Sequence, residues 1–171
     1  MTKPASVGAV EELPREKIEH FDRELQAILK RYPPDRKAAA MLPALRLGQE
    51  VFGYASPAVQ RLCADRLGVS AARAEEVATF YVMFHTEPVG AHVVEVCTNV
   101  SCSLCGGERI FEYLKKKLAL ANGQTTRDGR ITVREVECLG SCGTAPAMLV
   151  DEEMYERLDV QKVEQIVGGL K

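Results

Sequence analysis

The stretch ITVREVECLGSCGTAPAMLV, residues 131–150, joins two predicted strands through a loop that carries a pair of cysteines. Residues 131–136 alternate apolar and polar side chains, which is typical of a half-buried strand, and residues 147–150 form a second short apolar run. Cys138 and Cys142 lie between the two runs in a C-x3-C spacing. A rigid strand is therefore expected to deliver the chain directly to a loop with two thiols.

A second cysteine loop lies upstream and follows the same plan. Residues 92–96 form a short β-branched run, and Cys97 and Cys102 follow it in a C-x4-C spacing. Two such loops on neighbouring strands supply four thiolates around one small centre. Iron–sulfur clusters require soft thiolate ligands, together with backbone N–H donors near the sulfur atoms. Gly140 and Gly143 allow the second loop to bend closely around a cluster.

The two halves of the chain show different periodicities. Residues 14 to about 86 predict four helices, and Pro43 inside the second, over 37–52, predicts either a kink or a later start. The order after residue 89 is strand, helix, strand, strand, strand, helix, which is the order of a thioredoxin-like sheet. We therefore predict an α+β chain, with an N-terminal helical bundle over residues 1–88 and a thioredoxin-like α/β domain over residues 89–171.

The net charge and the distribution of apolar residues exclude some classes of function. The net charge is -2 and the pI is about 6.0, so there is no overall attraction to nucleic acid or anionic lipid. No apolar run approaches the length of a membrane-spanning helix, and residues 1–14 match neither a signal nor a transit peptide. We expect a cytoplasmic protein without direct membrane insertion. In that reducing compartment, clustered cysteines are more often metal ligands than disulfides.

Three other interpretations of the cysteines compete with this one. Structural zinc sites mostly use tighter C-x2-C spacings. Thiol–disulfide exchange is typical of a C-x-x-C motif, which Cys102 and Cys105 match, but it leaves Cys138 and Cys142 without a role. A plant-type ferredoxin site uses Cys97, Cys102, Cys105 and either Cys138 or Cys142. We interpret Cys105 as a bystander, because it immediately precedes a glycine pair and an amphipathic helix, where a small apolar residue packs.

Four segments carry a family resemblance: LPALRLGQEVFGYAS, VATFYVMF, VCTNVSC and VECLGSCGTAPAMLV. They resemble the thioredoxin-like [2Fe-2S] ferredoxin subunits of respiratory complex I, NADH:quinone oxidoreductase. The resemblance implies one [2Fe-2S] cluster on Cys97, Cys102, Cys138 and Cys142, with no catalytic site in the chain itself. It gives Cys105 no role, and Cys63 lies outside the motifs.

The resemblance also implies a partner subunit and a location. The N-terminal helical region docks on an NADH-oxidising flavoprotein subunit, and FMN and NADH lie on that partner, at the cytoplasmic face of the inner membrane. The chain has no G-x-G-x-x-G after a predicted strand, which agrees with the absence of its own dinucleotide site. Related subunits serve NAD-linked hydrogenases and formate dehydrogenases, and this alternative stays open.

A remote alternative is an iron–sulfur-sensing DNA-binding regulator, because residues 59–84 imitate a helix-turn-helix. A recognition helix presents basic and amide side chains to DNA, whereas here Arg73 is followed by Glu75 and Glu76. Negative charge at this position repels phosphate, so no nucleic-acid partner is expected. The aromatic residues at 80, 81 and 84 are expected in the core of the helical region.

Overall fold

The computed structural model describes residues 12–170 of the chain. The chain divides into two compact units, Met1–Pro88 and Val89–Lys171, and each has its own hydrophobic core. The expectation about a leader at residues 1–14 falls mostly outside the described residues. Within residues 12–170, no helix is both long enough and apolar enough to cross a lipid bilayer.

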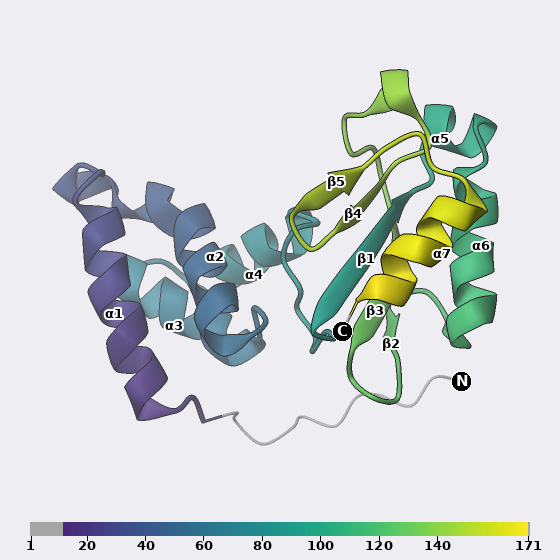
Figure 1. The fold of residues 1–171 in the computed structure, drawn as a ribbon. Helices are drawn as coiled ribbons and strands as arrows, with labels where there is room; N and C mark the ends of the chain where they lie inside the picture. Colours follow the sequence, from purple (N-terminus) through teal and green to yellow (C-terminus); the bar gives the residue numbers. More distant parts are fainter. Residues whose placement is uncertain (1–11, 171) are drawn as a thin grey trace, which may run out of the picture. The chain divides into compact units, whose positions relative to one another are not determined.

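The N-terminal unit is built from helices whose ends follow local sequence signals. Its elements are α1 (Arg15–Leu29), the 3-10 helix η1 (Pro34–Ala40), α2 (Met41–Phe52), α3 (Pro57–Leu67) and α4 (Ala71–Phe80) (Figure 1). Ser56 and Ser70 cap α3 and α4, since each hydroxyl oxygen accepts a hydrogen bond from the backbone N–H three residues further on. Gly68 ends α3 in the left-handed conformation that glycine adopts without strain.

Two boundaries bear on the predictions for this unit. The second α-helix begins at Met41, so Pro43 lies in its first turn, where a missing N–H removes no intrahelical hydrogen bond. The fourth helix ends at Phe80, because Tyr81 adopts an extended backbone. Phe80 is 77% exposed and Tyr81 39% exposed, so the prediction that these two rings belong to the core is wrong, whereas Phe84 is buried.

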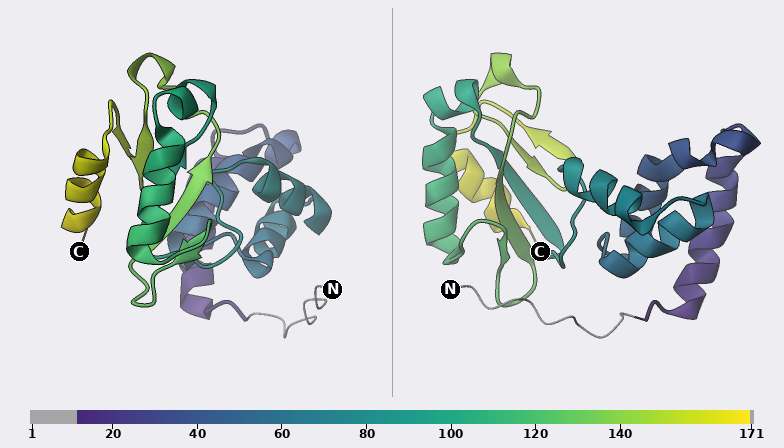
Figure 2. Two further views of the ribbon diagram at one scale, coloured as in Figure 1. Left: turned by 90° about the vertical axis from the view of Figure 1, so that its right-hand side faces the viewer. Right: turned by 180° about the vertical axis from the view of Figure 1, so that it is seen from behind.

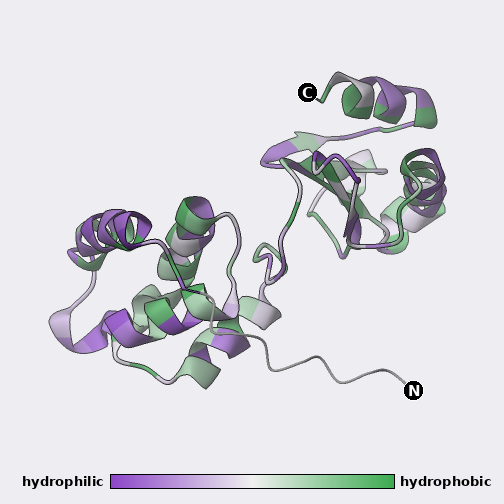
Figure 3. Cartoon of the chain, turned by 90° about the horizontal axis from the view of Figure 1, so that it is seen from below, coloured by the Kyte–Doolittle hydropathy of each residue, from purple (hydrophilic) through white to green (hydrophobic). Residues whose placement is uncertain are grey.

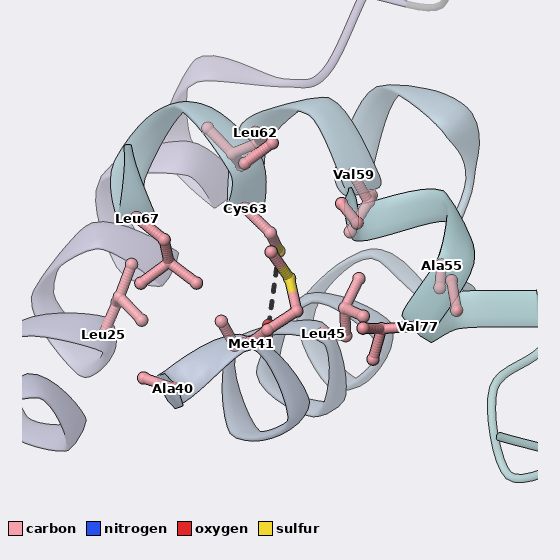
Figure 4. Close-up of a cluster of buried hydrophobic side chains, with 14 of the residues drawn as sticks. Leu25, Ala40, Met41, Leu45, Ala55, Val59, Leu62, Cys63, Leu67 and Val77 are labelled. Carbon is pink, nitrogen blue, oxygen red and sulfur yellow. Dashed lines mark hydrogen bonds between the residues drawn. The ribbon is translucent and has the colours of Figure 1, made fainter. Parts of the chain in front are cut away.

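All four α-helices contribute to the core of the N-terminal unit, which Figure 4 shows in close-up. Cys63 on α3 is fully buried there, and its thiol donates a hydrogen bond to the carbonyl oxygen of Ala44 at 3.5 Å. Burial raises the pKa of Cys63 to about 12. Helices α2 and α3 pack closely at Gly48, where an added Cβ would lie 2.5 Å from Cγ1 of Val59. Cys63 is thus a packing residue.

The C-terminal unit contains a five-stranded sheet in the order β2-β3-β1-β4-β5. Its elements are β1 (His92–Cys97), α5 (Val100–Leu104), α6 (Gly107–Leu118), β2 (Gln124–Thr125), β3 (Ile131–Val136), the 3-10 helix η2 (Cys142–Thr144), β4 (Met148–Val150), β5 (Glu153–Tyr155) and α7 (Val160–Gly169). Strand β1 pairs in parallel with β3 and antiparallel with β4. The short elements α5 and β2 are additions to the predicted order.

One face of the sheet carries the core of this unit. Alternate residues of the three central strands point toward α6 and α7, which pack against the same face (Figures 1 and 2). The core members from the strands are Val94, Val96, Ile131, Val133, Met148 and Val150. Helix α7 buries Val163 and Val167 and places polar residues between them, as its alternating colours near the C label show in Figure 3. The period-2 alternation thus sets which face receives the helices.

Candidate metal centre

Both cysteine loops begin at the carboxyl ends of neighbouring strands, on the same side of the sheet. Strand β1 ends at Cys97 and β3 ends at Val136, and the parallel register pairs these two residues. The backbone N–H of Thr98 donates to the carbonyl oxygen of Val136 at 3.1 Å, which continues the pairing past the end of β1. The carboxyl ends of parallel neighbours lie side by side. The topology therefore brings the C-x4-C and C-x3-C loops together.

The first loop folds into the short helix α5. Asn99 precedes this helix, and its Oδ1 accepts a hydrogen bond from the N–H of Val100 at 2.9 Å. Cys97 and Cys102 are 2% and 3% exposed, and they pack with Ala147. Burial raises the pKa of Cys102 to about 11, and the neighbouring thiol of Cys97 adds to this shift. Without a metal, the Cys102 thiol therefore holds its proton.

The second loop presents its thiols to solvent. Cys138 and Cys142 are exposed, and their Sγ atoms lie 3.4 Å apart. Gly140, at a φ of 82°, turns its N–H toward Sγ of Cys138 at 3.4 Å, and this donation lowers the pKa of that thiol. The hydrogen bond with Cys138 raises the pKa of Cys142. Cys138 is thus the thiol of this pair that the loop favours as a thiolate.

Direct contacts join the two loops. The loops lie close enough that Ser101 on α5 lowers the pKa of Cys142, against the larger raising effect of Cys138. Nδ2 of Asn99 donates to Oε2 of Glu137 at 2.7 Å. Within residues 12–170, no group of three or more His, Cys, Asp and Glu side chains is already arranged to hold a metal ion. The two thiol pairs are neighbours, but they do not form a closed ligand shell.

Gly107 is a site residue whose role the sequence did not define. A Cβ at this position would lie 2.5 Å from the carbonyl oxygen of Cys97 and 2.9 Å from that of Cys102. Helix α6 therefore starts directly against the backbone of the first loop. The Gly106–Gly107 pair was the available signal, but only the structure distinguishes Gly106, which adopts a φ of 99°, from Gly107, which allows the close contact. Cys105 lies between α5 and this pair and is exposed, so the expectation that it packs as a small apolar residue is wrong.

A model of the thioredoxin-like [2Fe-2S] ferredoxin family matches residues 25–171. The chain belongs to this family. Membership confirms the predicted thioredoxin-like fold with mixed α/β content, and it assigns a [2Fe-2S] cluster as the cofactor.

Two curated relatives carry the name expected from the resemblance, since both are named as subunits of NADH-quinone oxidoreductase. The relative from Mycobacterium bovis (strain ATCC BAA-935 / AF2122/97) is 36% identical over 164 residues, which cover 96% of this chain and 64% of the relative. The chain thus spans slightly less than two thirds of that relative. The relative from Rhizobium meliloti (strain 1021) is 41% identical over 148 residues, 86% of this chain and 87% of the relative. The predicted resemblance is confirmed.

A solved structure supports the fold. The crystal structure of an NAD+-reducing [NiFe]-hydrogenase in the air-oxidised state superposes with a TM-score of 0.66 at 20% identity, over 81% of this chain and 24% of that chain. At this identity, the likeness concerns the fold alone.

The residues at the sheet edge fit the cofactor of the family. Two thiolates bound to one tetrahedral metal at about 2.3 Å lie about 3.8 Å apart. The 3.4 Å separation of the Cys138 and Cys142 sulfur atoms is close to this value. Four thiols in two pairs match the four-cysteine ligation of a [2Fe-2S] cluster, with one pair for each iron. The N–H of Gly140 supplies the kind of donor that stabilises ligand sulfur.

Proposed function

We propose that this chain is the electron-transfer subunit of an NADH:quinone oxidoreductase. Its [2Fe-2S] cluster is held by Cys97, Cys102, Cys138 and Cys142, and single electrons pass between this cluster and the flavin of an NADH-oxidising partner subunit. FMN and NADH lie on that partner, which agrees with the relatives named as NADH-quinone oxidoreductase subunits. The chain has no catalytic site of its own.

The main support for this proposal is that two thiol pairs lie close together at the carboxyl ends of neighbouring strands. Each pair begins at the end of one of two parallel neighbours, β1 and β3, and Asn99 in the first loop hydrogen-bonds with Glu137 next to Cys138 in the second. When bound, the cluster supplies one-electron oxidation and reduction. Thiol–disulfide exchange by Cys102 and Cys105 is less favoured, because Cys105 is exposed while Cys102 is buried.

The residues around the thiols offset the negative charge of the cluster site and determine which thiols are exposed to solvent. Each added electron increases the negative charge at the site, and N–H donors to the sulfur atoms offset this charge. Gly140 provides such a donor to Cys138. Cys97 and Cys102 are shielded from water, whereas Cys138 and Cys142 are exposed. A cluster held by these residues would therefore have one pair of ligands covered by protein and one pair in contact with solvent.

The N-terminal helical bundle, residues 1–88, is the docking region for the flavoprotein. Support comes from four consecutive exposed apolar residues, Phe80 to Met83, at the end of α4. Exposed apolar side chains that are contiguous are typical of protein interfaces. Through this partner, the chain lies at the cytoplasmic face of the inner membrane without inserting into it.

The alternatives receive less support. The equivalent subunit of an NAD-linked hydrogenase or formate dehydrogenase is the second candidate, but the curated relatives cited above are named for quinone reduction. A DNA-binding role is disfavoured because Nη1 of Arg73 forms an ion pair with Glu76 at 2.7 Å, at the start of the helix that would read the bases.

Iron and sulfide analysis combined with EPR tests the proposal. The anaerobically purified chain is expected to contain about two irons and to give a rhombic spin-half signal after dithionite reduction. Zinc, or no metal, in anaerobic preparations would contradict the cluster assignment. Electron transfer is tested separately, by mixing the chain with an NADH-oxidising flavoprotein subunit and following bleaching of the cluster absorbance after NADH is added.

Cysteine variants test the ligand set. Alanine at Cys97, Cys102, Cys138 or Cys142 should lower the iron content and change the EPR signal. Cys105→Ala and Cys63→Ala are the matched controls and should retain about two irons per chain. Iron loss in Cys105→Ala together with retention in Cys142→Ala would favour the plant-type ligand set instead.

A further inference from the structure

Helix α5 exposes apolar side chains beside the cysteine loops. Val100 is 71% exposed and Leu104 is 85% exposed, and their four-residue spacing places them on one face of the helix. Cys102, on the opposite face, is buried. Side chains this exposed contribute little hydrophobic stabilisation to the chain itself, since most of their apolar surface remains in water.

This helical face is continuous with the exposed thiol pair. Asn99, which caps α5 next to Val100, hydrogen-bonds with Glu137 next to Cys138, and Sγ of Cys138 lies 3.4 Å from Sγ of Cys142. We call the combined surface of Val100, Leu104 and the Cys138–Cys142 loop the α5 face. It is the side on which the cysteine ligands reach solvent, since Cys97 and Cys102 are covered by protein.

Carboxylates surround the α5 face. Glu108 accepts a hydrogen bond from Ser103 on α5, Glu137 accepts one from Asn99, and Glu156 accepts hydrogen bonds from Ser141 and Thr144 in the second loop. Two arginines lie nearby. The side chain of Arg109 lies close to Gly106. Arg157 follows Glu156 in sequence, but it lowers the pKa of Glu156 less than the hydrogen bonds from Ser141 and Thr144 do. The cluster adds further negative charge, because four thiolates and two sulfides outweigh two irons.

We propose that the α5 face is a second docking surface for the electron donor, in addition to the helical bundle, and that the donor presents there an apolar centre rimmed by lysine and arginine. This inference rests on the proposed function and adds the contact surface and the chemistry of the partner. Electron transfer between proteins requires a short path, so the donor must approach the exposed ligands. The apolar side chains supply contact area, and the carboxylates select a basic partner and exclude an acidic one.

The test uses two substitutions at one position. Leu104→Lys and Leu104→Glu both remove the apolar contact, but they change the local charge in opposite directions. Each full-length, cluster-loaded chain is mixed with the NADH-reduced flavoprotein subunit, and the second-order rate of cluster reduction is measured by stopped-flow at several salt concentrations. Met154→Lys, on β5, is the matched control, because Met154 is an exposed apolar residue outside the α5 face.

The three variants are expected to slow the reaction to different extents. Leu104→Lys slows the second-order reaction about tenfold or more, Leu104→Glu slows it less, and Met154→Lys leaves it unchanged. Higher salt slows the wild-type reaction, because attraction between opposite charges is screened. The iron content and EPR signal of all three variants stay as in wild type, which shows that the site is intact.

Other outcomes overturn the proposal. Rates equal to wild type in both Leu104 variants would exclude the α5 face as a docking surface, while leaving electron transfer itself established. A larger loss in Leu104→Glu than in Leu104→Lys would exclude a basic partner. If wild type forms a dimer that Leu104→Lys dissociates, the occupant is a second copy of this chain. A wild-type chain that holds a cluster but accepts no electron from the flavoprotein would remove both this inference and the proposed function.

Discussion

Asn99 and Glu137 join the two cysteine loops: Nδ2 of Asn99 donates a hydrogen bond to Oε2 of Glu137 at 2.7 Å. Asn99 lies inside the C-x4-C motif and Glu137 immediately precedes Cys138. A hydrogen bond to a charged group is among the stronger polar interactions in proteins. This bond couples two segments that are 38 residues apart in sequence.

Removing this bond should loosen the cluster site. Asn99→Ala is expected to cost about 1–2 kcal/mol of stability, because it removes a charge-assisted hydrogen bond and the side chain that caps α5. Iron release to a chelator should become faster. Asn122→Ala is a matched control, since Nδ2 of Asn122 donates to Oε1 of Glu135 at 3.0 Å in the same unit, outside the cysteine loops. Equal iron-release rates in the two variants would show that the inter-loop bond does not protect the cluster.

Gly107→Ala should disturb the cluster more than any surface glycine substitution. The added Cβ meets backbone atoms of Cys97 and Cys102, which cannot move without shifting these two proposed ligands. We expect a loss of about 1–3 kcal/mol in the free energy of unfolding and a changed EPR line shape. Gly168→Ala on α7 is the control, because its Cβ meets no atom within 4 Å, and it should be neutral or stabilising. An unchanged EPR spectrum in Gly107→Ala would contradict this close contact.

The two cysteines outside the proposed ligand set should differ sharply in reactivity. Burial raises the pKa of Cys63 to about 12, so at pH 8 only about one in ten thousand of these thiols is ionised. Cys105 is exposed. Iodoacetamide should therefore label Cys105 and leave Cys63 unmodified in the folded, cluster-loaded chain, as mass spectrometry would show. Labelling of Cys63 before unfolding, or protection of Cys105 by an intact cluster, would contradict this assignment.

The turn before β3 should contribute a pH-dependent stability. Asp128 accepts hydrogen bonds from Oγ1 of Thr126 at 2.5 Å and from Nε of Arg130 at 2.7 Å, and these interactions lower its pKa from 3.8 to about 2. A depressed pKa means that the folded state favours the carboxylate. The stabilisation is therefore present above pH 3.8 and is lost as the pH falls toward 2.

An NMR titration of the Asp128 carboxyl carbon measures this pKa directly. Thr126→Val removes the largest contributor and should move the midpoint toward 3.8. A wild-type midpoint already at 3.8 would show that the turn does not hold the carboxylate. Asp128→Asn should abolish the corresponding acid-dependent change in the melting temperature.

The sequence was most informative where local signals act over a few residues. Ser56 and Ser70 begin helices because a hydroxyl satisfies N–H groups of the first turn, and both caps are readable without a structure. The alternation over residues 131–136 predicted the strand, although Thr132 and Val136 are buried on the face opposite Ile131 and Val133. In contrast, Phe80 and Tyr81 follow helical spacing and yet lie exposed, because burial depends on which other element arrives to cover a face.

By itself, the sequence determined the class of site: two cysteine pairs, each directly after a strand, within a thioredoxin-like order of elements. Only the tertiary structure decided the difference between the pairs. The parallel pairing of β1 with β3 brings the loops together, the contact of Gly107 with Cys97 seats the first loop against α6, and the second loop stays exposed. The physical reason is the sequence separation over which each effect acts. Spacing and propensity are properties of neighbouring residues, whereas burial and solvent access result from contacts between segments far apart in the chain.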